Sequence, residues 1–270
     1  MHTLSGTPHS RLGLGANPDT GDGFAEVAYA AGVNFFFFYN LSFTGMLDGL
    51  ERLVRDSRES VILATGTEKR NPSDMRADLD EARSRLGVDV IDLFYAQYIS
   101  PSDDMEAVLG KDGVIDEIAR WRDEGKVRYV GATAHNRPLS VKLIESGRID
   151  VLMHRYNMAH RGSEEQVLPA AIEAGVPVAA FACTRWGSLL EGHADWGGPV
   201  PSAADCYRYV LNHPAVQLAM MSPASPAHLE EDLCVLGDGG GADAEQIARW
   251  EAYGELVHGK GDDSYETDWP

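Results

Sequence analysis

Polar side chains follow three apolar segments in the second half of the chain, where they could bind an anion or transfer a proton. His135 follows the apolar segment 127–134, and an imidazole gives or takes a proton near neutral pH. Arg155 and Asn157 end the next segment, and Arg185 ends the one after it. A guanidinium forms paired hydrogen bonds with a carboxylate. We therefore predict that His135, Arg155, Asn157 and Arg185 carry the chemistry.

Each of these residues also has a purely structural interpretation. The ring of His135 could bond a loop carbonyl, and Asn157 could brace a loop. Successive residues of a strand point to opposite faces. The prediction therefore requires Arg155 and Asn157, rather than His154 and Tyr156, to point inward.

Three further side chains are predicted to line a substrate pocket. Tyr39 is a phenol, and Gln97 can donate a hydrogen bond to a carbonyl but supplies no proton. Trp186 offers a flat ring to a ligand, or it simply covers the mouth of the pocket. The sequence has no glycine-rich phosphate loop and no histidines in zinc-ligand spacing, so no metal is expected.

Short apolar segments alternate with longer amphipathic ones along the chain. Most of the short segments are apolar at successive positions, as in strands buried on both faces, and Phe35–Phe38 is the extreme case. The expected strands are residues 11–16, 32–40, 60–66, 90–98, 127–135, 151–157, 177–184 and 216–222. Strands that alternate with helices form a parallel sheet, and right-handed crossovers close it. The sequence therefore predicts an α/β fold, a (β/α)8 TIM barrel, with its chemistry at the C-terminal ends of the strands.

Helical periodicity and capping residues place the helices between these strands. The expected helices are residues 74–86, 113–124, 163–174, 203–211, 227–236 and 244–257. Ser73 and Ser202 are the expected N-caps of two helices, and Pro226 starts a third. The chain is expected to form a single domain over residues 1–270, with a mobile acidic tail at 262–270.

The composition limits the partners. The chain has 23 Lys and Arg residues against 42 Asp and Glu residues, a net charge of -19. This field repels nucleic acid and anionic membranes, and no run reaches the ~18 apolar residues of a membrane span. The expected partner is a small-molecule ligand, and the oligomeric state is left open. Three cysteines without metal spacing or a secretion signal indicate reduced thiols in the cytoplasm.

Several motifs resemble those of the aldo-keto reductase family. Residues 85–94, RLGVDVIDLF, resemble its "RLGxDYIDLY" signature, and residues 124–131, EGKVRYVG, resemble "EGKIRYIG". Tyr156 and Asn157 with Leu168 and Pro169 resemble its "YN…LP" stretch. The resemblance spans most of the chain in the right order and implies a TIM barrel of aldo-keto reductase type.

The family's four catalytic residues, an Asp, a Tyr, a Lys and a His, do not match this sequence. Phe37 stands at the position of the Asp, Gly66 at that of the Lys and Gln97 at that of the His. The Tyr would fall at Ser42 or Phe43. Replacing both members of a buried Lys–Asp pair avoids an unpaired charge in the barrel core. We therefore expect that the chain is not a standard NADPH-dependent aldehyde or ketone reductase.

The resemblance also assigns positions to a nicotinamide cofactor. If one binds, Phe181 is the ring that stacks on it, Thr133 replaces the Ser that holds its carboxamide, and Ser222 and Ser225 are further cofactor-binding residues. Met153 replaces the family's Gln at the end of the sixth strand. The anchors are thus only partly kept.

At the adenosine end, the resemblance puts Ala224 where an Arg grips the 2′-phosphate of NADPH, and Asp232 where an Asn reads adenine. An Asp near a phosphate is repulsive. The favoured interpretation is therefore a non-redox isomerase, lyase or cyclase acting on a small carbonyl- or carboxylate-bearing metabolite, without a cofactor or with only weak NADP binding. The alternatives are a divergent NAD(P)(H)-dependent oxidoreductase with a replaced proton donor, and a non-catalytic binding protein.

Overall fold

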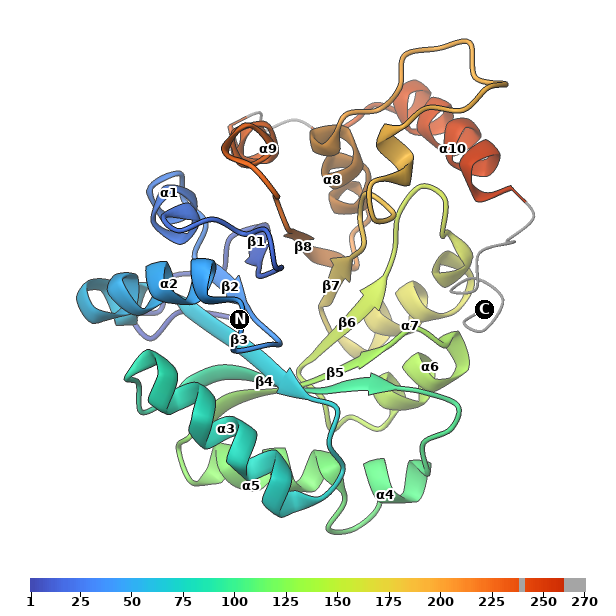
Figure 1. Ribbon diagram of the computed structural model, residues 1–270. Coiled ribbons are helices and arrows are strands. Elements are labelled where there is room, and N and C mark those ends of the chain that lie inside the picture. The colour runs from blue at the N-terminus through green and yellow to red at the C-terminus, as the bar shows by residue number, and fades with distance from the viewer. Residues whose placement is uncertain (238–240, 260–270) are drawn as a thin grey trace.

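The computed structural model describes residues 1–237 and 241–259, so the predicted tail at 262–270 lies outside the described residues. Eight parallel strands close into a barrel in the order in which they occur in the chain (Figure 1). The strands are β1 (Leu12–Gly15), β2 (Phe35–Phe37), β3 (Ile62–Thr67), β4 (Ile91–Ile99), β5 (Val127–Ala134), β6 (Val151–Arg155), β7 (Val178–Phe181) and β8 (Val216–Met221). The pairing of Leu12 with Ala219 closes the barrel. The predicted TIM barrel is confirmed.

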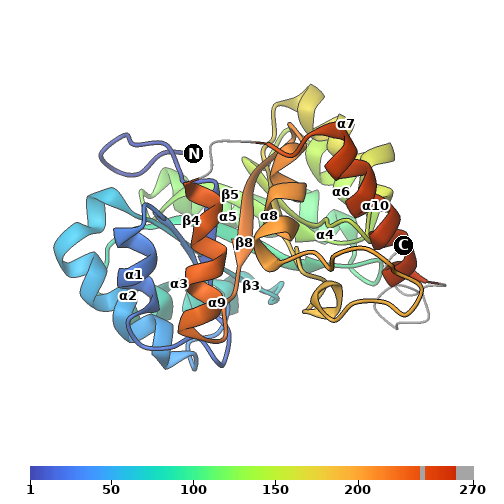
Figure 2. The ribbon, with the colours of Figure 1, turned by 90° about the horizontal axis from the view of Figure 1, so that it is seen from above.

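Helices surround the strands in both views (Figures 1 and 2). The α-helices are α1 (Phe24–Ala30), α2 (Thr44–Ser57), α3 (Pro72–Leu86), α4 (Met105–Leu109), α5 (Val114–Asp123), α6 (Arg137–Glu145), α7 (Val167–Ala174), α8 (Ala203–Asn212), α9 (Pro226–Leu233) and α10 (Ala244–His258). Short 3-10 helices are η1 (Arg58–Ser60), η2 (Gly162–Glu165), η3 (Ser188–Leu190) and η4 (Cys234–Leu236). The last helix, α10, packs on α8 through the rings of Trp250 and Tyr209.

The strands are buried on both faces, as their composition predicts. Phe35 and Phe37 point into the barrel, where they join Tyr95 and Met153 in an inner cluster. Phe36, and Phe38 directly after β2, point outward into the larger cluster between strands and helices. Burying an aromatic side chain stabilises the fold by roughly 1.5–3 kcal/mol, so the four consecutive phenylalanines fix β2 between the two cores.

Capping residues set where the helices begin. Ser202 forms a capping box with Asp205, and Pro226 is the first residue of α9, both as expected. The expected Ser73 cap is wrong, because α3 begins two residues earlier, at Pro72. Asn71 is the N-cap, and its side chain accepts a hydrogen bond from the Ser73 amide at 2.9 Å. Pro72 fits the first turn because it has no amide hydrogen to leave unpaired.

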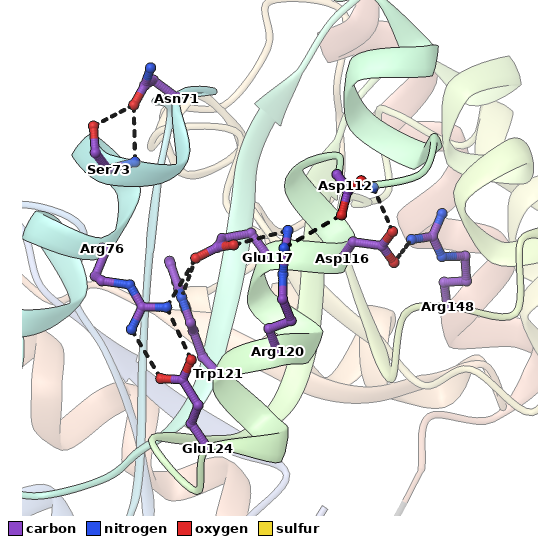
Figure 3. A network of polar contacts seen from close by, with 10 residues as sticks. All are labelled: Asn71, Ser73, Arg76, Asp112, Asp116, Glu117, Arg120, Trp121, Glu124 and Arg148. Atoms are coloured by element: carbon purple, nitrogen blue, oxygen red, sulfur yellow. Dashed lines mark hydrogen bonds and ion pairs between the residues drawn. The ribbon is translucent and has the colours of Figure 1, made fainter.

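Ion pairs neutralise part of the acidic surface on the outer helix layer. Arg76 of α3 lies between Glu117 and Glu124 of α5 (Figure 3), with N–O distances of 3.1 and 3.0 Å. Glu117 also accepts a hydrogen bond from the Trp121 indole at 2.7 Å, and the Arg76 guanidinium lies over the Trp121 ring. This network joins α3, which packs on β3, to α5, which packs on β5.

Candidate active site

A cavity of about 680 Å³ opens at the C-terminal ends of the strands, where the fold predicts chemistry. We call it the mouth cavity. Residues from seven strands or strand ends line it: Gly15, Phe37, Gln97, Thr133, Met153, Phe181 and Met220. The predicted pocket residues Tyr39, Gln97 and Trp186 all line it. Its size falls in the range of ligand and cofactor sites, so the barrel mouth is not filled by side chains.

Strained backbone surrounds the mouth cavity. Tyr98, Ala182 and Trp186, which line it, have φ values of 49°, 53° and 53°, and Arg185 has 52°. Non-glycine residues adopt this left-handed region at a cost of about 1–3 kcal/mol each, and such residues gather at functional sites. The C-terminal end of β4, which contains Tyr98, and the loop after β7 are therefore held in shapes that local preference alone does not favour.

The floor of the mouth cavity beside β2 and β3 is apolar. Phe37 is 8% exposed, and its ring packs edge-on against the Tyr95 ring with centroids 5.8 Å apart. A Cβ atom added at Gly66 would lie only 2.4 Å from the carbonyl oxygen of Tyr95. Tyr95 and Gln97 thus fill the space beside Gly66, and no charged side chain fits there without a backbone shift.

The opposite wall, from β5 and β7, suits a nicotinamide ring. Phe181 presents an aromatic face to the cavity. Thr133 is 4% exposed and lines the same cavity, and within residues 1–237 and 241–259 its hydroxyl has no hydrogen-bond partner. A buried polar atom without a partner costs about 1–3 kcal/mol, so a ligand amide that bonds it is stabilised. An aromatic ring and a buried hydroxyl without a partner in the described residues, both lining one cavity, match the ring and the carboxamide of a nicotinamide.

His135 lies between Phe181 and Tyr98 at the edge of the mouth cavity. Its ring centroid is 4.5 Å from that of Phe181 and 5.3 Å from that of Tyr98. Burial, and then the charges of His154 and Arg155, lower the pKa of His135 to about 3. The imidazole is therefore neutral at physiological pH, so it can donate one hydrogen bond to a substrate oxygen without carrying a charge.

The far wall of the mouth cavity is formed by the loop after β8 and by α9. Ser222 lines the cavity, whereas the hydroxyl of Ser225 caps α9 by accepting a hydrogen bond from the His228 amide at 3.2 Å. Burial and the neighbouring Glu231 raise the pKa of Asp232 to about 7. The carboxyl that the sequence predicts to repel a phosphate is thus largely uncharged below neutral pH.

The structure brings only part of the predicted catalytic set together. His135 lines the mouth cavity and, with Arg155, also lines a neighbouring cavity of about 530 Å³. Asn157 is fully buried, where its amide donates to Ala182 at 2.8 Å and its oxygen accepts from two backbone amides. Arg185 donates to the Val257 carbonyl of α10 at 2.8 Å. The catalytic role of these residues stays a prediction.

Strand alternation explains the place of Arg155. Met153, two residues earlier, belongs to the inner cluster, so Arg155 follows it on the inward face of β6. His154 points outward, where its Nδ1 lies 2.6 Å from the Ala134 carbonyl and 3.1 Å from the Ser140 hydroxyl. Tyr156 points outward too and bonds Glu164 at 2.9 Å.

We call the second cavity the basic cavity. It lies beside the mouth cavity, between the loops after β5 and β6 and the end of α10, and its lining includes Arg137, Arg155 and Arg161 with His135 and His160. Sequence reasoning did not single it out. The signal was a repeated His–Arg pattern near residues 135–137, 154–155 and 160–161 in an acidic chain. Among the described residues, no three His, Cys, Asp or Glu side chains converge as metal ligands.

The chain belongs to the aldo/keto reductase family, whose sequence profile matches residues 27–197. The fold is similar to that of aldo-keto reductase AKR11C1 from Bacillus halodurans in its holo form, with a TM-score of 0.76 and 18% identity over 94% of this chain and 95% of the other. It is also similar to the glycerol dehydrogenase AKR11B4 from Gluconobacter oxydans, with a TM-score of 0.73 and 18% identity over 96% and 95%. These two likenesses show the fold.

A sequence relative is the NADH-specific methylglyoxal reductase of Escherichia coli (strain K12), 25% identical over 122 residues. The match covers 45% of this chain and only 36% of the length of that relative.

The favoured non-redox interpretation is wrong, and so is the expectation that no cofactor is used. The family and the sequence relative named as a reductase point to an oxidoreductase. The non-redox prediction is wrong because it relied on the residues of β2–β4. The resemblance predicts that those strands lack the family's charged residues, but Thr133 of β5 and Phe181 of β7 line an open cavity, and the Thr133 hydroxyl has no hydrogen-bond partner among the described residues.

No helix within the described residues is both long and apolar enough to span a membrane.

Proposed function

We propose that this chain is a nicotinamide-dependent oxidoreductase that interconverts a carbonyl and an alcohol in the mouth cavity. One observation carries the proposal. The cavity is lined by both the Phe181 ring and the Thr133 hydroxyl, a buried donor that has no partner among the described residues. The cavity volume of about 680 Å³ leaves room for the reactive end of the cofactor and a small substrate.

Thr133 and Phe181 hold the cofactor in this proposal, and Ser222 lies on the wall toward its phosphates. When bound, the nicotinamide supplies or accepts the hydride. Thr133 bonds the carboxamide and so fixes which face of the ring meets the substrate. Phe181 excludes water from the other face, which strengthens every polar interaction in the cavity.

His135 and Tyr98 act on the substrate oxygen. The neutral imidazole of His135 donates a hydrogen bond to the carbonyl, which stabilises the negative charge that develops there. Tyr98 packs edge-on against His135 and takes the role of the missing family Tyr, because a phenol is a stronger acid than a neutral imidazole. Gln97 offers a second hydrogen bond from the floor. The pKa of about 3 keeps His135 neutral, which leaves proton donation to the phenol.

The two tyrosines on the rim give a matched test. Tyr98 and Tyr39 are 49% and 52% exposed, and both line the mouth cavity, but only Tyr98 contacts His135. NADH oxidation should be followed by absorbance over a panel of aldehydes, ketones and 2-oxo acids. We expect Tyr98→Phe to lower kcat by about 10²-fold or more, and Tyr39→Phe to change it less than about threefold. Equal effects of the two variants would refute the role of Tyr98.

Two other expectations stay predictions. The chain has three free cysteines, two of them buried, which is compatible with the proposed cytoplasmic location. The partner we propose is a small-molecule substrate, and the oligomeric state is left open.

A further inference from the structure

The basic cavity has a charge opposite to that of the whole protein. The chain carries a net charge of -19, yet three arginines line this cavity of about 530 Å³, together with four histidines, of which His135, His154 and His160 are uncharged near neutral pH. Glu255 is the one acidic residue in the described lining. A local positive field inside a negative protein attracts a particular anion while the surface repels others.

The arginines of the basic cavity differ in whether a carboxylate neutralises their charge. Arg161 forms ion pairs with Glu164 and Glu251 at 3.1 and 3.0 Å. For Arg137, no carboxylate of residues 1–237 or 241–259 lies within ion-pair distance. Its guanidinium rests against Gly162, where an added Cβ would lie 2.0 Å from Nη1. The glycine thus lets the charge of Arg137 approach the loop after β6.

The basic cavity also contains a hydroxyl that can donate a hydrogen bond to a ligand. Ser163 is 3% exposed and lines the basic cavity, and its Oγ atom has no hydrogen-bond partner within the described part of the chain. An anion that accepts from Ser163 and from Arg137 removes the cost of the unbonded hydroxyl and gains charge-assisted bonds.

Two histidines of the basic cavity, His135 and His160, lie close to its arginine charges. Burial, followed by the charges of Arg155 and Arg185 and by His258, lowers the pKa of His160 to about 3. His135 is affected similarly by Arg155. Burial is the larger cause at both histidines, and the charge of Arg155 adds to it at each, so both rings lie within reach of that guanidinium.

The basic cavity and the mouth cavity share His135. We propose that the basic cavity binds the anionic group, a carboxylate or a phosphate, of the substrate whose carbonyl or hydroxyl reacts in the mouth cavity. This inference rests on the proposed function for its reaction, but the anion site itself does not require a cofactor. The substrate class is therefore a small carbonyl compound, or its alcohol, that bears an acidic group.

Calorimetry without NADH tests the anion site directly, with inorganic phosphate and succinate as probes. We expect one site, and we expect Arg137→Gln to weaken the binding of the preferred probe about tenfold, which is about 1.4 kcal/mol. Ser163→Ala should weaken it as well. Arg55→Gln is the matched control, because Arg55 is 68% exposed and paired with Glu51, and its loss changes the net charge equally. The control should bind like the wild type.

Failure to bind either probe would overturn the inference, and so would equal binding by the wild type and Arg137→Gln. Matched substrates then separate a free anion site from a substrate site. In at least one of two substrate pairs, the acidic member should have a KM at least about tenfold lower than the neutral one. The pairs are succinic semialdehyde with butanal, and glyceraldehyde 3-phosphate with glyceraldehyde. Arg137→Gln should abolish this difference in KM. Equal KM values within both pairs would overturn the link to the substrate. A separate NADH titration tests the proposed function, so the two can fail independently.

Discussion

His135 should make the protein sensitive to mild acid. Its pKa falls from 6.5 to about 3 on folding, through burial first and then through His154 and Arg155. Between these two pH values the unfolded chain binds more protons than the folded one, so stability decreases as the pH falls. One such histidine lowers the free energy of unfolding by about 2 kcal/mol between about pH 7.5 and about pH 5.

The variant His135→Gln isolates this contribution. Urea denaturation, followed by tryptophan fluorescence at a series of pH values, gives the free energy of unfolding of each protein. Acid should destabilise the variant about 2 kcal/mol less than it destabilises the wild type over this range. Thr133→Val alters the same cavity without removing a titrating group, so its profile should run parallel to that of the wild type. Parallel profiles for His135→Gln and wild type would refute the buried, neutral imidazole.

Three further predictions concern the floor and the far wall of the mouth cavity. Phe37→Asp should lower the free energy of unfolding by at least ~3–5 kcal/mol, measured by urea denaturation, because it removes a buried ring and adds a charge; an unchanged value would mean that Phe37 faces water. Gly66→Ala should cost ~1–3 kcal/mol and lower the Tm, because its Cβ would lie 2.4 Å from the Tyr95 carbonyl; a Tm equal to that of the wild type would contradict this close approach. NADH should bind more tightly than NADPH, and the ratio of the two calorimetric Kd values should increase from about pH 6 to about pH 8, because Asp232, with a pKa of about 7, becomes charged and repels the 2′-phosphate of NADPH. A ratio that does not change with pH, or that changes equally in Asp232→Asn, would exclude this role of Asp232.

The fold could be predicted because its signal is repeated in every strand. Phe35–Phe38 shows the reason, since a strand buried on both faces needs apolar residues at every position. The expected helices leave out α1, α2, α4 and α6. In α2 the apolar face at Met46, Leu50 and Leu53 has helical spacing, but Gly45 and Gly49 interrupt the pattern. Gly45 is needed for a close contact, because an added Cβ would meet the Thr20 carbonyl oxygen, whereas a Cβ at Gly49 would meet only the end of the Glu26 side chain.

The site could be predicted only in part, because its properties depend on burial and on loop shape. Thr133 and Phe181 were assigned from the resemblance to the aldo-keto reductase family, but that the Thr133 hydroxyl has no partner among the described residues is visible only in three dimensions. The positive φ of Tyr98 leaves no mark in the sequence. Asp232 misled the prediction, because a carboxyl that looks charged in the sequence is buried and has a pKa of about 7.

Direct titration of the protein with NADH tests the central proposal most directly. Protein-induced change in NADH fluorescence should saturate at one NADH per chain with a Kd of about 1–100 μM, roughly -8 to -5 kcal/mol. Thr133→Val removes the hydroxyl but keeps the shape of the side chain, and it should weaken NADH binding about five- to tenfold because the carboxamide loses its partner. An absence of any fluorescence change with NADH and NADPH up to about 1 mM, or equal affinities for the wild type and Thr133→Val, would contradict a nicotinamide site in the mouth cavity.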